Sequence, residues 1–229
     1  MEILTPVLGT VLGLVAGVAT GAGARLLLGR LDRGVIVRPP WCELAVGGLW
    51  ALGGASAFGG AVPLWWLPVQ LAVAWFTVAL VAVDVRHRRL PDALTLPAYP
   101  VAGLVLAPAV LAGPGPPLVG RAVGGAALFL AVHLVVRAVS PTSLGAGDVK
   151  LSGSLGAVAA SVSWGALPVV AVVAAVITAI VGALSRRFSG VWEGGSVIPH
   201  GPGLLLATLL VVVIPASEQP VLVPGVPRG

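Results

Sequence analysis

The sequence has few charged side chains. Only 9% of its 229 residues are Asp, Glu, Lys or Arg, with 13 basic and 8 acidic residues among them. A soluble domain carries about 25% charged residues, so this chain cannot cover a water-facing surface of ordinary polarity. Hydrophobic residues make up 58% of the chain, and the mean hydropathy is +1.06. These values exclude an ordinary soluble protein and favour a membrane protein.

Cysteine is almost absent. Cys42 is the single cysteine, which excludes an internal disulfide and a cysteine-rich zinc site. The net charge of +5 does not indicate a nucleic-acid partner, because the basic residues are spread between apolar runs and form no basic face. The amino-terminal apolar stretch has no basic segment before it and no clear cleavage signal, so we expect it to be retained as a span.

Long apolar runs of Val, Leu, Ala and Gly follow one another along the chain. A helix needs about 20 mostly apolar residues to cross a bilayer, and several runs have that length. The sixth run is short and glycine-rich, and the eighth carries His200-Gly201-Pro202 near its start, so either could be a broken span and a total of seven stays open. The sequence therefore predicts an all-α polytopic membrane helix bundle, one transmembrane domain over residues 1–229. The expected elements are 3–28, 41–60, 64–83, 95–113, 117–138, 149–162, 164–184 and 199–215.

The basic residues predict the orientation of these spans. If successive spans alternate in direction, all of the 13 basic residues except Arg121 and Arg228 fall on one side of the membrane. Cytoplasmic loops are rich in Lys and Arg, so we expect this side to be cytoplasmic and the amino terminus to lie outside. The residues on this side are Arg25, Arg30, Arg33, Arg38, Arg86, Arg88, Arg89, Arg137, Lys150, Arg186 and Arg187.

Two acidic residues occupy matching positions in this topology. Asp84 ends the third run and Asp148 begins the sixth, both at the expected cytoplasmic boundary. Carboxylates in or beside a bilayer are costly and tend to be functional. No other two of the 8 acidic residues are matched in this way, so Asp84 and Asp148 are the candidate catalytic pair.

A pair of carboxylates suits the hydrolysis of a peptide bond by an activated water. One ionised aspartate takes a proton from the water, while the other, protonated, hydrogen-bonds the scissile carbonyl, and the proton later passes to the leaving amine. Two close carboxylates do not both ionise readily, so they share a proton. We expect Gly145 and Gly147 to let a substrate backbone approach Asp148, and Lys150 to orient that carboxylate or hold a lipid headgroup.

Three segments resemble a known family, the prepilin peptidases or type IV leader peptidases. Residues 145–151 read GAGDVKL, which resembles the family's GxGD-x-KL signature. Asp84, six intervening residues and then Pro91-Asp92 are similar to its first aspartate motif. Residues 198–202 read IPHGP, similar to its IPxGP segment, in which x is usually a large apolar or aromatic residue. The resemblance covers about residues 40–215. The motif residues are Asp84, Pro91, Asp92, Gly145, Gly147, Asp148, Lys150, Pro199, Gly201 and Pro202.

The resemblance implies a membrane-embedded aspartyl endopeptidase with Asp84 and Asp148 as its catalytic residues. Its substrate would be a type IV prepilin or pseudopilin, cut behind a short basic leader at the cytoplasmic face of the bacterial inner membrane. Some members also methylate the new amino terminus and carry a larger cytosolic insert with paired cysteines. Here residues 29–40 form only a short expected cytoplasmic loop and Cys42 stands alone, so we expect no zinc, no other cofactor and no methyltransferase activity.

The individual residues also have purely structural interpretations. Asp84 could neutralise a neighbouring arginine at the end of a helix, and Asp148 could be a helix N-cap. For Asp92, which follows a proline, helix capping is the more common role. His133 is expected to pack or to hydrogen-bond between helices, and His200 is not expected to be catalytic.

A function of a different class also uses two membrane carboxylates. In a small proton-coupled transporter, Asp84 and Asp148 would carry protons and the two irregular elements would line a pathway. Transporters usually place their ionisable residues near the middle of the bilayer, whereas both aspartates here are expected at its boundary. The boundary position favours the peptidase, and the transporter remains the alternative.

Overall fold

The computed structural model of the chain describes residues 4–31, 34–87, 90–141, 144–189 and 200–214. Within these ranges the chain is helical apart from short connections and contains no strand, which confirms the predicted all-α bundle. The helices are α1 (Leu4–Arg30), α2 (Trp41–Phe58), the 3₁₀ helix η1 (Leu64–Trp66), α3 (Leu67–His87), α4 (Asp92–Thr95), α5 (Ala98–Ala112), α6 (Pro117–Val139), α7 (Ala146–Val162), α8 (Ala166–Ser189) and α9 (Gly201–Val213).

The helices α1, α2, α3, α5, α6, α7, α8 and α9 correspond in order to the eight predicted elements. The fourth element differs in its start, because the short α4 precedes α5 and Pro97 stands at the N-cap of α5. Proline has no backbone N–H to donate, so it is tolerated at a helix start and separates two helical segments. The third helix runs to His87, four residues past the predicted end.

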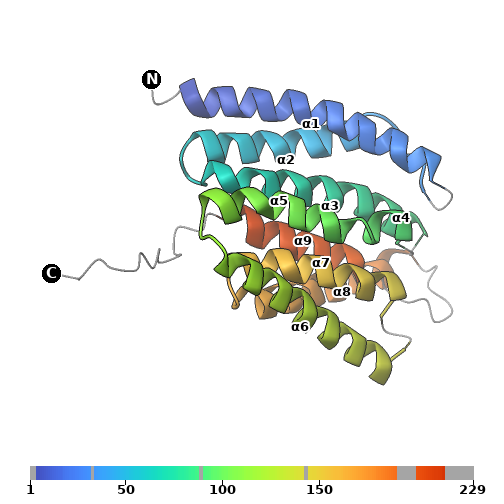
Figure 1. Cartoon of the computed structure of the whole chain (residues 1–229). Helices are drawn as coiled ribbons and strands as arrows, with labels where there is room; N and C mark the ends of the chain where they lie inside the picture. Colours follow the sequence, from blue (N-terminus) through green and yellow to red (C-terminus); the bar gives the residue numbers. More distant parts are fainter. Residues whose placement is uncertain (1–3, 32–33, 88–89, 142–143, 190–199, 215–229) are drawn as a thin grey trace.

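The helices pack side by side in an order that differs from their order in the chain (Figure 1). α1 packs along α2, α2 against α3, and α6 along α7. The last helix, α9, contacts α3 as well as α7 and α8, so it lies inside the bundle. The indole of Trp66 and the amide of Gln70 both donate to the Val212 carbonyl in the last turn of α9, which holds that end of α9 against α3.

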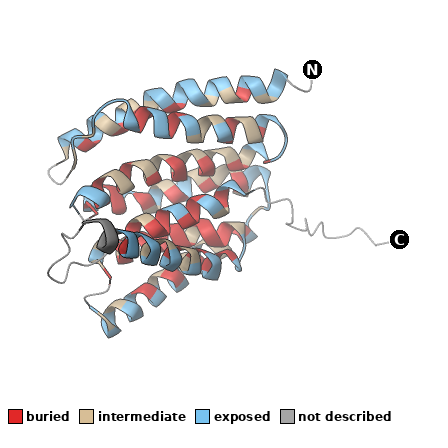
Figure 2. Cartoon of the chain, turned by 180° about the vertical axis from the view of Figure 1, so that it is seen from behind, coloured by how far each residue is buried: buried red, intermediate tan, exposed pale blue. Residues whose placement is uncertain are grey.

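Burial is concentrated in the helices at the centre of the bundle (Figure 2). Most residues of α7 are buried, including Ser152 and Ser154, whose hydroxyls donate to carbonyls of their own helix. These bonds satisfy polar groups that have no access to water. α1, at the edge, exposes large apolar side chains such as Leu8 and Val15. An apolar exposed face of this kind is suited to lipid.

The two irregular elements of the prediction are regular helices in their described parts. α7 is continuous over its 17 residues, and α9 begins at Gly201, so Gly201 and Pro202 stand at the start of a helix and interrupt none. α9 has 13 residues, about 20 Å at 1.5 Å per residue, which is short of a full span. Most of α9 packs against α3, α7 and α8, and one stripe of it, Leu206, Leu210 and Val213, is exposed.

Five helical segments of the described chain are long and apolar enough to cross a membrane. Their lengths and composition agree with a multi-pass membrane protein. They are Leu4–Arg30, Leu64–His87, Asp92–Ala112, Pro117–Val139 and Ala166–Leu184.

The two ends of the bundle differ in charge. Arg30, Arg86 and Arg137 occupy the last turns of α1, α3 and α6, and Lys150 lies near the start of α7. These helix ends meet at one end of the bundle, on the right in Figure 1. Arg121 is near the opposite end, where its guanidinium donates to the Ser161 carbonyl of α7. The predicted clustering of basic residues at one end therefore holds for these described residues.

Candidate active site

Asp84 and Asp148 lie at this basic end of the bundle, on two helices that run in opposite directions. Asp84 is three residues before the end of α3, and Asp148 is the third residue of α7. Their exposed fractions are only 3% and 7%, although both lie in terminal turns. Leu80 and Val83 on α3 and Leu151 on α7 are also buried, so the neighbours of the two aspartates along their own helices belong to the apolar core.

Gly201 brings the two carboxyls together. A Cβ atom added to Gly201 would lie 2.8 Å from Asp84 Oδ2 and 2.9 Å from Asp148 Oδ1. The two oxygens are therefore no farther apart than the sum of these distances, and they flank the backbone of the first residue of α9. The sequence motifs singled out all three residues, and the structure brings them to one place. The need for glycine here is steric, because any side chain would collide with both carboxyls.

The two carboxyls have different hydrogen-bonding surroundings. Backbone hydrogen bonds from Gly145 and Gly201 reach the Asp148 carboxylate. Asp84 Oδ2 is buried and has no hydrogen-bond partner in the structure. A buried polar atom without a partner is costly, and a proton shared between the two carboxyls would give this oxygen one. Two carboxyls buried this close together do not both ionise readily.

Leu90 covers this pair from the side of the connection between α3 and α4. A Cβ atom on Gly147 would lie 2.8 Å from Leu90 Cβ, and one on Gly201 would lie 3.3 Å from Leu90 Cδ1. The space above Gly147, which was expected to admit a substrate backbone, is thus occupied by the Leu90 side chain. Sequence reasoning missed Leu90. Its only signal is its place directly before Pro91 in the first motif.

Lys150 and Asp92 form an ion pair between α7 and α4. Lys150 Nζ lies 2.8 Å from Asp92 Oδ1, and both side chains are partly exposed to solvent. The Tyr99 hydroxyl donates to the Lys150 carbonyl at 2.7 Å, which ties α5 to the same turn. The Lys150 ammonium thus pairs with Asp92 and not with Asp148, and binding of a lipid headgroup by Lys150 stays a prediction.

The expectation that Asp92 caps a helix is wrong. Pro91 occupies the N-cap position of α4, and its carbonyl accepts from the backbone N–H groups of Leu94 and Thr95. Asp92 is the first residue of α4, and its carboxylate is used by Lys150. Sequence spacing did not reveal this pair, since the two residues are far apart in the chain.

Comparison with known proteins gives a consistent result. A model of the type IV leader peptidase family matches residues 71–183, a segment that contains both aspartates. A prepilin leader peptidase/N-methyltransferase from Stutzerimonas stutzeri is 32% identical over 172 residues, which are 74% of this chain and 56% of the relative. The protein of the same name from Xanthomonas campestris pv. campestris is 32% identical over 170 residues, 72% of this chain and 53% of the relative. Over most of its length, the chain resembles members of the type IV leader peptidase family.

The match to this family is partial in length. A third relative of the same name, from Pseudomonas aeruginosa, is 29% identical over 143 residues, 62% of this chain and 48% of the relative. The chain thus spans about half the length of the curated relatives it matches. No solved structure matches the chain. Gly201 lies outside the segment matched by the leader peptidase family model, and the structure connects it to the aspartates within that segment.

The remaining motif residues are the two prolines of the third motif. Pro202 lies in the first turn of α9, where its missing N–H costs no helix hydrogen bond. Pro199 lies outside the described residues. Within the described part of the chain, no group of three or more His, Cys, Asp and Glu side chains could hold a metal ion. Cys42 is buried and unpaired with any cysteine.

Proposed function

We propose that this protein is a membrane aspartyl endopeptidase that removes the leader of type IV prepilin-like proteins. The observation that carries the proposal is the pair of buried carboxyl oxygens of Asp84 and Asp148 on either side of Gly201. The family supports a peptidase, and the relatives' names support a prepilin substrate. Substrate, activity and the roles of individual residues are inferred for this chain from these observations.

In the proposed mechanism the two aspartates share one proton before the reaction. The ionised member accepts a proton from a water molecule, which attacks the scissile carbonyl carbon, while the protonated member donates a hydrogen bond to the carbonyl oxygen. The tetrahedral intermediate then collapses as its C–N bond breaks, and a proton from the dyad passes to the leaving amine. Water is consumed, two peptide fragments are formed, and the dyad returns to its single shared proton.

Access of a peptide to this pair requires a local rearrangement. Both carboxyls are buried, and Leu90 lies over the gap between Gly147 and Gly201. We propose that the substrate displaces the Leu90 side chain and occupies its place. The Lys150–Asp92 pair on the adjacent surface is partly exposed, and such pairs contribute only about 0–1 kcal/mol. It is therefore no large barrier to that movement.

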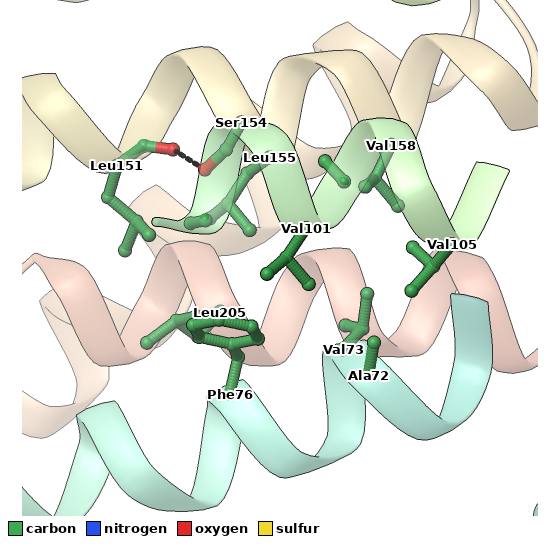
Figure 3. Close-up of a pocket in the computed structure, with 12 residues that line it drawn as sticks. Ala72, Val73, Phe76, Val101, Val105, Leu151, Ser154, Leu155, Val158 and Leu205 are labelled. Carbon is green, nitrogen blue, oxygen red and sulfur yellow. Dashed lines mark hydrogen bonds between the residues drawn. The ribbon is translucent and has the colours of Figure 1, made fainter. Parts of the chain in front are cut away.

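An apolar pocket lies between α3, α5, α7 and α9 and begins one turn after Asp148 along α7 (Figure 3). Its lining includes Phe76 of α3 and Val101 of α5. Leu151, one turn after Asp148 on α7, and Leu205, one turn after Gly201 on α9, also line it. Ser154 also lines it, but its hydroxyl is bonded to the Leu151 carbonyl. The lining of this pocket is apolar, so it offers no polar path for protons or solutes. Nothing in the described chain supports the transporter alternative.

The proposed orientation places the active site on the cytoplasmic side and the amino terminus outside. It rests on the arginines at the end of the bundle that holds the aspartates and on the excess of basic residues in cytoplasmic loops. The proposed location is the bacterial inner membrane. Residues 29–40 remain proposed as a short cytoplasmic loop within a single transmembrane domain, and we propose no methyltransferase activity for it.

The test is cleavage of a co-expressed prepilin by the parent protein and by Asp84→Asn and Asp148→Asn. Each variant keeps the shape of the side chain but removes its acid–base function, so we expect cleavage to fall by about 10²- to 10⁴-fold. Glu43→Gln is the matched control, because Glu43 is a buried carboxylate that pairs with Arg25 at 2.7 Å, away from the dyad. We expect this control to cleave normally. A parent that cleaves no prepilin contradicts the proposed activity, and normal cleavage by either Asn variant contradicts the dyad.

A further inference from the structure

His200 is held in place by a hydrogen bond to α8. Its Nδ1 atom lies 3.0 Å from the hydroxyl oxygen of Thr178, and that hydroxyl donates its single hydrogen to the Ala174 carbonyl at 2.8 Å. The hydroxyl therefore accepts from the His200 ring, which fixes the proton of a neutral His200 on Nδ1. The neighbouring His133 uses its own Nδ1 on the Phe129 carbonyl and does not compete for Thr178.

The same contact seats the first turn of α9 against α8. A Cβ atom on Gly203 would lie 2.6 Å from the Ala174 carbonyl oxygen and 2.7 Å from the Thr178 hydroxyl oxygen. The backbone of α9 thus approaches α8 closely at the residues that bind His200. His200 is the N-cap of α9, so its side chain holds the first turn of α9 against α8.

The peptide that joins His200 to Gly201 reaches the catalytic pair. Its N–H, on Gly201, forms the backbone hydrogen bond to the Asp148 carboxylate. Gly201 also lies against both carboxyls closely enough to exclude a side chain. A small shift of this turn therefore changes a hydrogen bond to Asp148 and the contact with Asp84 together.

We propose that His200, anchored by Thr178, is a positioning residue that holds the Gly201 N–H against Asp148. This inference rests on the proposed peptidase function and adds to it a residue that touches neither substrate nor the reacting atoms. The polar partner of His200 sits on α8, outside all three sequence motifs.

The first experiment compares Thr178→Val with Thr178→Ser in prepilin cleavage. Valine has the shape of threonine but cannot accept from His200, whereas serine keeps the hydroxyl. We expect Thr178→Val to lower kcat about three- to tenfold, in line with the loss of one hydrogen bond, with KM within about twofold of the parent. Thr178→Ser is expected to restore kcat. Thr208→Val is the matched control, because buried Thr208 has only the equivalent bond to a carbonyl of its own helix, that of Leu204.

A second comparison tests the pair directly. His200→Phe keeps a ring but loses the Nδ1 donor, and it should lower kcat as Thr178→Val does. Because both changes remove the same contact, the double variant should be no slower than either single variant. Additive losses in the double variant, or equal kcat for Thr178→Val and Thr208→Val, would overturn the proposal.

A measurement without substrate separates this inference from the proposed function. Labelling of carboxyls by a water-soluble carbodiimide, followed by peptide mass spectrometry, reports how accessible Asp84 and Asp148 are. We expect faster labelling of Asp148 in Thr178→Val than in Thr208→Val and the parent. If the parent cleaves no prepilin but this difference is found, the positioning role stands and the peptidase assignment fails. If labelling is the same in all three proteins, the positioning role is wrong, whether or not the parent cleaves.

Discussion

The α1–α2 pair and the α3–α7–α9 group use glycine for different purposes. In the first, a Cβ on Gly17 would lie 2.8 Å from the Gly47 Cα and 2.8 Å from the Val46 carbonyl oxygen, so glycine lets two helix backbones touch. In the second, Gly201 faces the side-chain oxygens of Asp84 and Asp148. Small residues at helix contacts are common in membrane proteins. The same residue type therefore supports packing in one region and makes room for two carboxyls in the other.

The buried acidic residues of the two regions also differ in their partners. Glu43 on α2 is the buried acid of the first region, and it is paired with Arg25 of α1. Asp84 and Asp148 in the second region have no basic side chain as a salt-bridge partner among the described residues. A buried charge that is neutralised stabilises or orients a helix pair, whereas two buried carboxyls facing each other are available for proton transfer. This contrast separates the structural region from the candidate active site.

Among the changes that test this contrast, Gly201→Ala has the largest expected effect. The new methyl group would lie under 3 Å from both carboxyl oxygens, so the pair must move apart, and a misplacement of about 1 Å costs about 10²-fold in rate. We expect prepilin cleavage to fall about 100-fold with the protein still folded in the membrane. Gly48→Ala is the control, because a Cβ there has nothing within 4 Å. Unchanged cleavage by Gly201→Ala would mean that the contact between Gly201 and the dyad is not needed.

Gly17→Ala should do the opposite, reducing stability but leaving the chemistry intact. The methyl group would meet backbone atoms of α2 below 3 Å, and overpacking of this kind costs about 1–3 kcal/mol. Thermal unfolding in detergent, followed by tryptophan fluorescence, should show a lower Tm than for Gly23→Ala, where the added Cβ meets nothing within 4 Å. The cleavage rate per folded molecule should match that of the parent. A loss of rate without a loss of Tm would remove the contrast between the two regions.

Leu90→Ala should uncover the candidate active site. Leu90 is 9% exposed and packs over Gly147 and Gly201, so truncation removes contacts that hold the covered state. If the covered state loses about 1.4 kcal/mol of stability, a small loss for a buried Leu→Ala change, the fraction of molecules with an uncovered dyad rises about tenfold. Carbodiimide labelling of Asp84 and Asp148 should therefore accelerate about tenfold. Leu104→Ala on the exposed face of α5 is the control. Equal labelling in both variants would show that Leu90 does not cover the dyad.

The smallest expected effect belongs to the surface pair of Asp92 and Lys150. Exposed ion pairs contribute about 0–1 kcal/mol, so Asp92→Asn and Lys150→Met should each change the free energy of unfolding by no more than about that amount. Cleavage should stay within about threefold of the parent at ordinary salt, and the difference from the parent should shrink at high salt. A double-mutant cycle measures the coupling between them. A loss comparable to Gly201→Ala would place this pair in the catalytic machinery.

Much of this fold and part of the site could be predicted from the sequence. The apolar runs marked the helices, because each run must be long enough to satisfy its own backbone in a bilayer. Asp84, Asp148 and Gly201 were singled out by motifs. Leu90 and Thr178 were missed, because an apolar residue beside a motif and a threonine in an apolar helix carry no distinctive pattern. The role of Asp92 was misjudged, because its partner Lys150 is remote in sequence.

By itself the sequence determined that the chain is a membrane helix bundle. It also determined the bounds of the helices to within a few residues, and that two aspartates lie at one charged end. Only the tertiary structure decided which faces meet, that Gly201 lies between the carboxyls, and that His200 is bound to Thr178. The physical reason is that lipid and protein interior are both apolar. Hydropathy therefore locates a membrane helix along the chain but does not indicate which of its faces packs against its neighbours.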